Sequence, residues 1–191
     1  TQGLDENNVA RSSEEEIFNF VISELGIAAE KLPESWPTDD LGRVTRGAAL
    51  ALQSRIALLS GNYELAASSA KKVIDSETYS LYPDYRELFQ YTGENNNEVI
   101  FQIMFQYGIE AHRMPLSIGS RNSKSHSTKV PSQSMVDSYE CVDGLTIDES
   151  PLYNPANPFE NRDPRLKQTI ATPGDIFLGY QFETHRDSIM C

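Results

Sequence analysis

The chain of 191 residues has only two cysteines, one tryptophan and three histidines. Cys141 and Cys191 are too few for a disulfide scaffold or a zinc site, and the sequence leaves open whether they pair. A membrane-crossing helix would need about 18 consecutive apolar residues, and the chain has no such run. It also lacks the basic segment and apolar core of a signal peptide. Because it begins with Thr1 rather than Met and stops in HRDSIMC, we interpret it as a piece of a longer polypeptide.

Basic residues are scarce relative to acidic ones. The 16 lysines and arginines face 28 aspartates and glutamates, which gives a net charge of −12. Such a charge argues against nucleic acid as a ligand and against adsorption to anionic lipid. The apolar share of 39% is low, but it suffices for one domain with a core.

The stretch from Arg43 to Ser76 predicts two antiparallel helices joined by a tight turn. The apolar helical pattern stops at Gly61, which can adopt the positive φ that ends a helix, and Asn62 can cap the next helix. The first helix, about Thr45 to Ser60, is apolar on two sides, so we expect neighbours on both. Such a unit cannot bury its own faces, and we expect the chain to fold poorly in isolation.

The hairpin is compatible with a tetratricopeptide repeat. In that repeat, small residues lie where the helices cross and an aromatic residue follows the turn. Gly61, Tyr63, Ala66 and Ala70 fit this spacing, but Leu50 stands where the repeat favours Trp. An ordinary helical hairpin therefore stays open as an alternative.

Other elements are predicted on either side of the hairpin. Ser13 and Glu16 form a capping box that opens a helix to Lys31. The alternating apolar residues of 98–107 predict a strand, from Glu98 to Tyr107. Residues 108–134 have no apolar period and predict a long loop, and Pro131 opens a short helix. Beyond residue 144 five prolines predict an extended, turn-rich tract. This gives a helical part over residues 1–107 and a loop-rich part over residues 108–191.

Two regions carry side chains that suit a ligand. In the long loop, five residues could donate hydrogen bonds to hydroxyl groups: His112, Arg113, Arg121, Asn122 and His126. A solvated loop without a ligand is the alternative. Trp36, in the acidic connection before the hairpin, could stack on a sugar ring, or it could pin this connection onto the helices.

No catalytic motif is present. The sequence lacks a GxSxG elbow, an HExxH helix and a phosphate-binding glycine loop. Glu160 and Asp163 could form a glycosidase carboxylate pair. However, the flanking Arg162 and Arg165 would keep Asp163 ionised, which is wrong for a general acid.

A cation site is not predicted either. Asp143, Asp148 and Glu149 could bind a hard cation, but they lack the spacing of a calcium loop. We therefore predict no enzymatic activity, no cofactor and no metal site.

Four blocks, in this order, resemble the SusD/RagB family of outer-membrane nutrient-binding lipoproteins. They are GRVTRGAALALQSRIALLSGNYELAASSAKKVIDS, LFQYTGENNNEVIFQIMF, PSQSMVDSYECVDG and SPLYNPANPFENRDPRLKQTI. Together they cover most of the stretch from Leu32 to Ile170.

The resemblance implies a mainly α fold of tetratricopeptide-like helical hairpins with long loops and a few short strands. It implies that both parts belong to one larger domain, anchored to the outer membrane by a lipid that this chain lacks. It also implies non-catalytic capture of a nutrient, such as an oligosaccharide, for a SusC-like TonB-dependent transporter.

The family has no motif that fixes its ligand contacts. The candidate ligand-binding residues are therefore chosen on chemistry alone, and they lie in or beside the long loop: Tyr107, His112, Arg121 and Asn122. Two other functions stay open. One is a protein-binding helical scaffold without a small ligand, and the other is a glycoside hydrolase.

Overall fold

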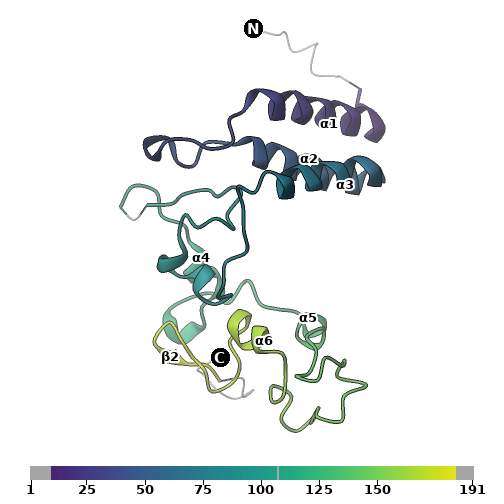
Figure 1. The fold of residues 1–191 in the computed structure, drawn as a ribbon. Coiled ribbons are helices and arrows are strands. Elements are labelled where there is room, and N and C mark those ends of the chain that lie inside the picture. The colour runs from purple at the N-terminus through teal and green to yellow at the C-terminus, as the bar shows by residue number, and fades with distance from the viewer. Residues whose placement is uncertain (1–9, 107, 184–191) are drawn as a thin grey trace. The chain divides into compact units, whose positions relative to one another are not determined.

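The computed structural model describes residues 10–106 and 108–183, and this part is mainly helical (Figure 1). The α-helices are α1 (Glu14–Lys31), α2 (Arg46–Leu59), α3 (Tyr63–Asp75), α4 (Met114–Ile118), α5 (Gln133–Asp137) and α6 (Pro164–Thr169). The 3-10 helices are η2 (Thr38–Asp40), η3 (Glu87–Phe89), η4 (Tyr91–Gly93) and η5 (Arg121–Ser123). Strands β1 (Ile176–Phe177) and β2 (Tyr180–Gln181) form a small antiparallel sheet. None of the helices in the described ranges is long and apolar enough to cross a membrane.

The chain divides into two compact units. Unit 1 ends at Met104 and holds the three long helices, and unit 2 begins at Phe105 and holds the short helices and the sheet. The division that the sequence predicts lies close by, after residue 107, and the single larger domain stays a prediction.

The three long helices of unit 1 begin where the sequence predicts. Ser13 and Glu16 form the capping box of α1, and Thr45 accepts the Ala48 N–H at the start of α2. After Gly61, at φ +79°, the Asn62 side chain accepts the Leu65 N–H and starts α3. Each cap satisfies a backbone donor that the helix itself leaves unpaired. The predicted first helix and the predicted hairpin are confirmed.

Helix α2 lies against α1 and against α3 (Figure 1). Ala29 of α1 packs with Ala49 and Leu50 of α2, and Val73 of α3 covers this small core. Two neighbours explain why α2 is apolar on two sides. The alanines allow close helix packing, because their side chains take little space between the axes.

One buried amide joins all three helices. Gln53 of α2 donates through Nε2 to the Ile22 carbonyl of α1, over 3.0 Å. Its Oε1 accepts the Ser69 hydroxyl of α3, over 2.8 Å. Gly26 leaves room for this side chain, since a Cβ there would lie 3.1 Å from Nε2. The polar interruption in α2 is therefore a cross-link between helices.

The predicted strand from Glu98 to Tyr107 is wrong over its described part, residues 98–106. The segment has only one isolated bridge, from Gln106 to Glu110 across its own turn. A strand is defined by hydrogen-bonded pairing with a neighbour, and within the described ranges residues 98–106 have no such pairing besides this bridge. Alternation of apolar residues indicated an extended backbone but could not supply the partner.

Unit 2 is held together around Arg162, which is only 6% exposed. Its guanidinium donates to the carbonyls of Pro158, Val136 and Tyr139 over 2.9, 2.8 and 2.7 Å. It also lies 5.6 Å from the centre of the Tyr153 ring. Two of these carbonyls lie at or just after the end of α5, so the cation joins α5 to the segment before α6.

The proline-rich tract is more regular than predicted. Asp163 caps α6 by accepting the Arg165 N–H, and Pro164 occupies the first turn, where its missing N–H costs nothing. Leu166 of α6 is fully buried. The expectation of an irregular tract is therefore wrong for α6 and for the β1–β2 hairpin.

Candidate functional site

The long loop carries the four residues that the sequence favours as ligand contacts. Tyr107 lies outside the described residues. His112 is exposed, its Nδ1 accepts the Met114 N–H over 3.3 Å, and its ring meets Phe105 edge-on at 5.5 Å. Arg121 and Asn122 belong to η5, and Arg121 is exposed. Among the described contacts, none joins His112 to Arg121, so their shared role stays a prediction.

The loop closes on itself through backbone hydrogen bonds. The N–H groups of His126 and Thr128 donate to Leu116 and Ser117, both over 2.8 Å, and Ser127 donates to Gly119 over 3.1 Å. Gly119 is buried, and a Cβ there would overlap the Ser125 side chain or displace it. These bonds hold the backbone that presents Arg121.

In the carboxylate pair weighed for glycoside hydrolysis, Asp163 is unsuited to the role of the acid. The Arg165 side chain donates to both oxygens of Asp163, and its backbone N–H donates to Oδ1; these hydrogen bonds lower the pKa of Asp163. A carboxyl group held ionised cannot protonate a leaving group. Arg162, expected to help, instead binds backbone carbonyls.

The acidic residues weighed for a cation serve turns. Asp143 accepts the Ser150 hydroxyl over 2.7 Å, and Glu149 accepts the Thr146 hydroxyl over 2.9 Å. In the described part of the chain, no group of three or more His, Cys, Asp or Glu residues could hold a metal ion. Cys141 is buried and free, and Cys191 lies outside the described residues.

A cavity of about 220 Å³ in unit 1 is lined by aromatic and polar side chains. It is lined from three segments: residues 34–45 before α2, residues 78–79 after α3, and residues 95–102. We call it the Trp36 cavity. Ligand pockets for drug-sized molecules measure about 300–1,000 Å³, so this cavity suits a small group such as one sugar ring.

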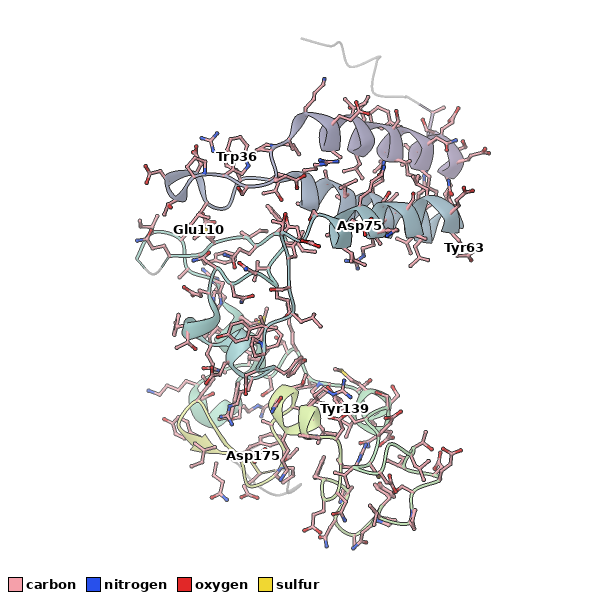
Figure 2. The ribbon with its side chains drawn as sticks, viewed as in Figure 1. Trp36, Tyr63, Asp75, Glu110, Tyr139 and Asp175 are labelled. Carbon is pink, nitrogen blue, oxygen red and sulfur yellow. The ribbon has the colours of Figure 1, made fainter. Side chains whose placement is uncertain are left out.

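Two aromatic side chains of the cavity are held in place by hydrogen bonds. Trp36, on the connection that follows α1 (Figure 2), donates through its indole N–H to the Val44 carbonyl over 2.9 Å. The Tyr79 hydroxyl lies 3.1 Å from the Thr45 hydroxyl, and its ring packs against Gly47, where a Cβ would clash with it. The Trp36 ring is thus fixed to Val44 of its own connection and also lines the cavity, while its pinning of this connection onto the helices stays a prediction.

Amide side chains supply the polar edge. Gln102 donates through Nε2 to Asn95 Oδ1 over 2.6 Å. Asn96 is turned inward, donating to the Gly93 carbonyl and accepting the Glu98 N–H over 2.7 Å. Phe101 lies between these polar groups in sequence and is 51% exposed. An exposed aromatic face beside amides can both stack and hydrogen-bond, as a sugar ring requires.

Sequence reasoning missed this cavity, although it singled out Trp36. The sequence placed Asn95 in a polar turn and Gln102 in a strand. It placed Tyr79 in an aromatic-rich loop. These residues meet only because α2 and α3 fold back and bring residues 78–102 to the connection before α2. The one usable signal was Trp36 itself, the single tryptophan.

Comparison with known proteins identifies the family. The sequence pattern of the SusD family matches residues 87–189, more than half of the chain. The chain belongs to the SusD family. Among solved structures, it is similar to a SusD-like carbohydrate-binding protein from Bacteroides fragilis NCTC 9343, with a TM-score of 0.89 and 30% identity over 98% of this chain and 37% of that one. A second SusD-like protein from the same organism gives a TM-score of 0.73 and 27% identity over 91% of this chain and 38% of that one.

Two curated relatives agree. SusD-like protein P25 of Formosa agariphila is 25% identical over 60% of this chain and 22% of its own length. A SusD-like protein of Bacteroides ovatus is 29% identical over 48% of this chain and 18% of its own length. The chain thus spans about a fifth of the length of the curated relatives it matches. The resemblance drawn from the sequence is confirmed, and so is a mainly helical fold.

Proposed function

We propose that the protein containing this SusD-family chain captures an oligosaccharide at the outer membrane without chemically changing it. It then delivers the sugar to a SusC-like TonB-dependent transporter. A lipid anchor outside this chain would hold it at the cell surface. The observation that carries the proposal is the likeness, over 98% of the chain, to a SusD-like carbohydrate-binding protein.

The Trp36 cavity supports the carbohydrate part of the proposal. It combines aromatic rings at Trp36, Tyr79 and Phe101 with amide groups, and two of its rings are fixed by hydrogen bonds before any ligand arrives. Fixed groups cost less conformational entropy on binding. Tyr107, His112, Arg121 and Asn122 remain proposed as ligand contacts of the long loop, independently of this cavity.

Exposed apolar residues of the α2–α3 hairpin support the proposed contact with a transporter. Leu58 and Leu59 at the end of α2 and Tyr63 and Ile74 of α3 are exposed, Ile74 by 75%. Tyr63 lies at the start of α3 (Figure 2). Leu58, Leu59 and Tyr63 lie beside the hairpin turn and Ile74 lies at the other end of α3, and exposed apolar side chains of this kind are available for contact with another protein. We propose that this other protein is the SusC-like transporter and that the tetratricopeptide-like hairpin packs against it.

Calorimetric titration of the purified protein with a panel of oligosaccharides tests capture. We expect saturable binding, weakened about threefold to tenfold by Phe101→Ala, because an aromatic contact is lost. Ile103→Ala is the matched control, since Ile103 is 72% exposed on the same segment and does not line the cavity. Equal weakening by both variants would remove the cavity from the binding site.

Activity and partner assays separate the two alternatives. A glycoside hydrolase would release reducing ends from the bound sugar, and Asp163→Asn would abolish that turnover. A protein scaffold would co-purify with a membrane barrel and show no saturable sugar binding. Binding without turnover is the outcome expected here.

A further inference from the structure

The two charged side chains that line the Trp36 cavity each form an ion pair with a residue outside its lining. Glu34 accepts from Arg46 over 2.8 Å. Arg43 donates to Asp40 of η2 over 2.9 Å, and its guanidinium also lies 5.5 Å from the centre of the Trp36 ring. In the described structure, each charged side chain that lines the cavity is therefore already paired with an opposite charge.

The amide pair at the cavity has free capacity of both kinds. Once Gln102 Nε2 has donated to Asn95 Oδ1, the Asn95 amide N–H groups and the Gln102 side-chain oxygen make no further hydrogen bond within the described residues. A hydroxyl group both donates and accepts, so it can satisfy both amides. A carboxylate or sulfate only accepts and would face the Gln102 oxygen unfavourably.

The net charge of the chain also disfavours a negatively charged ligand. The chain carries −12 in total. The chain would repel a polyanionic glycan electrostatically. Arg43, the cation at the cavity, is already paired with Asp40 and would attract the glycan less. An uncharged sugar is not repelled by the chain and does not need a free cation in the cavity.

We infer that the Trp36 cavity selects uncharged saccharides over uronates and sulfated sugars, and that Asp40 enforces this choice by holding Arg43. The inference rests on the proposed function, because it concerns the ligand of the same site. Asp40 does not line the cavity, so it acts on specificity through Arg43.

The test uses matched pairs of probes: hexasaccharides of glucose, mannose and galactose, each beside the same oligomer oxidised to uronates at C6. Titrations at low ionic strength keep the charge effect measurable. We expect at least one neutral oligomer to bind, and its uronate form to bind about tenfold more weakly. Equal or tighter binding of the uronate would overturn the inference and leave capture itself intact. Absence of binding by every oligomer would instead overturn the proposed function, and the inference with it.

Asp40→Asn sharpens the test because it frees Arg43. We expect the ratio between neutral and uronate affinities to narrow by about threefold to fivefold, the range of an exposed ion pair. Asp39→Asn is the matched control. It makes the same charge change one residue away in η2, without a contact to Arg43 among the described residues, and should leave the ratio unchanged. Equal narrowing by both variants would show that net charge, rather than the Asp40–Arg43 pair, sets the preference.

Discussion

The two units of this chain are stabilised by different kinds of contact. In unit 1, three capped helices bury alanines and Leu50, and a single amide, Gln53, links them. In unit 2, the buried residues include Ser120, Ser125, Ser150, Thr172 and Arg162, with few apolar ones such as Leu166 and Cys141. The first unit therefore depends on apolar packing between helices, and the second on polar side chains that hydrogen-bond to backbone carbonyls and to carboxylates. This difference decides which mutations hurt each unit and how far the sequence could be interpreted.

Loss of apolar packing in unit 1 should have the largest effect. Leu50 is 5% exposed, and Leu50→Ala removes its contacts between α1 and α2. We expect the free energy of unfolding to fall by about 3 kcal/mol, as for other buried leucines. Urea denaturation followed by helical circular dichroism measures it. Leu52→Ala, at 48% exposure in the same helix, is the control and should cost much less.

Loss of the buried cation should be the counterpart in unit 2. Arg162→Ala leaves the Pro158, Val136 and Tyr139 carbonyls without their donor, and we expect a loss of about 2–3 kcal/mol. Arg165→Ala in the same motif removes an exposed guanidinium and should change stability little. Hydrogen exchange of the α5 and α6 amides would locate the effect. Equal loss from both variants would mean that charge, not the buried geometry, matters.

A smaller change should separate polar from apolar contributions in unit 1. Ser69→Ala removes the hydroxyl that donates to Gln53, and leaves that buried amide with an unpaired oxygen. We expect a loss of about 1–2 kcal/mol, measured by the same denaturation. Ser68→Ala, whose hydroxyl is exposed and binds its own helix, is the control. No difference between them would show that unit 1 needs only its apolar contacts.

The smallest expected effect is a loss of stability at acidic pH. Hydrogen bonds from Arg165 lower the pKa of Asp163, and those from Thr172 lower the pKa of Asp175. Because the folded pKa lies below the unfolded one, this stabilisation is present above about pH 4 and is lost as the pH falls through the folded pKa. Denaturation midpoints of wild type and Asp163→Asn should therefore converge between pH 6 and pH 3. A gap that does not narrow would contradict this.

The same contrast explains what could be predicted from the sequence. Helices α1, α2 and α3 were predictable because Ser13, Thr45 and Asn62 cap them locally and their apolar residues recur at helical spacing. The α6 helix was missed because a proline tract hides a short helix whose cap, Asp163, was interpreted as an ion pair only.

Contacts between distant segments could not be predicted. The strand expected at residues 98–106 failed because alternation says nothing about a pairing partner. The burial of Arg162 depends on carbonyls 26 and 23 residues earlier in the chain. The Trp36 cavity likewise combines three separate segments, whereas the loop residues chosen by chemistry came from one.

The position of Trp36 allows ligand binding to be followed by the intrinsic fluorescence of this chain. It is the only indole in the 191 residues, and it lines the cavity with Arg43 over its ring. A sugar that enters the cavity changes the polarity around that single fluorophore, so its emission reports occupancy without a label. Binding elsewhere on the chain would leave the spectrum as it was.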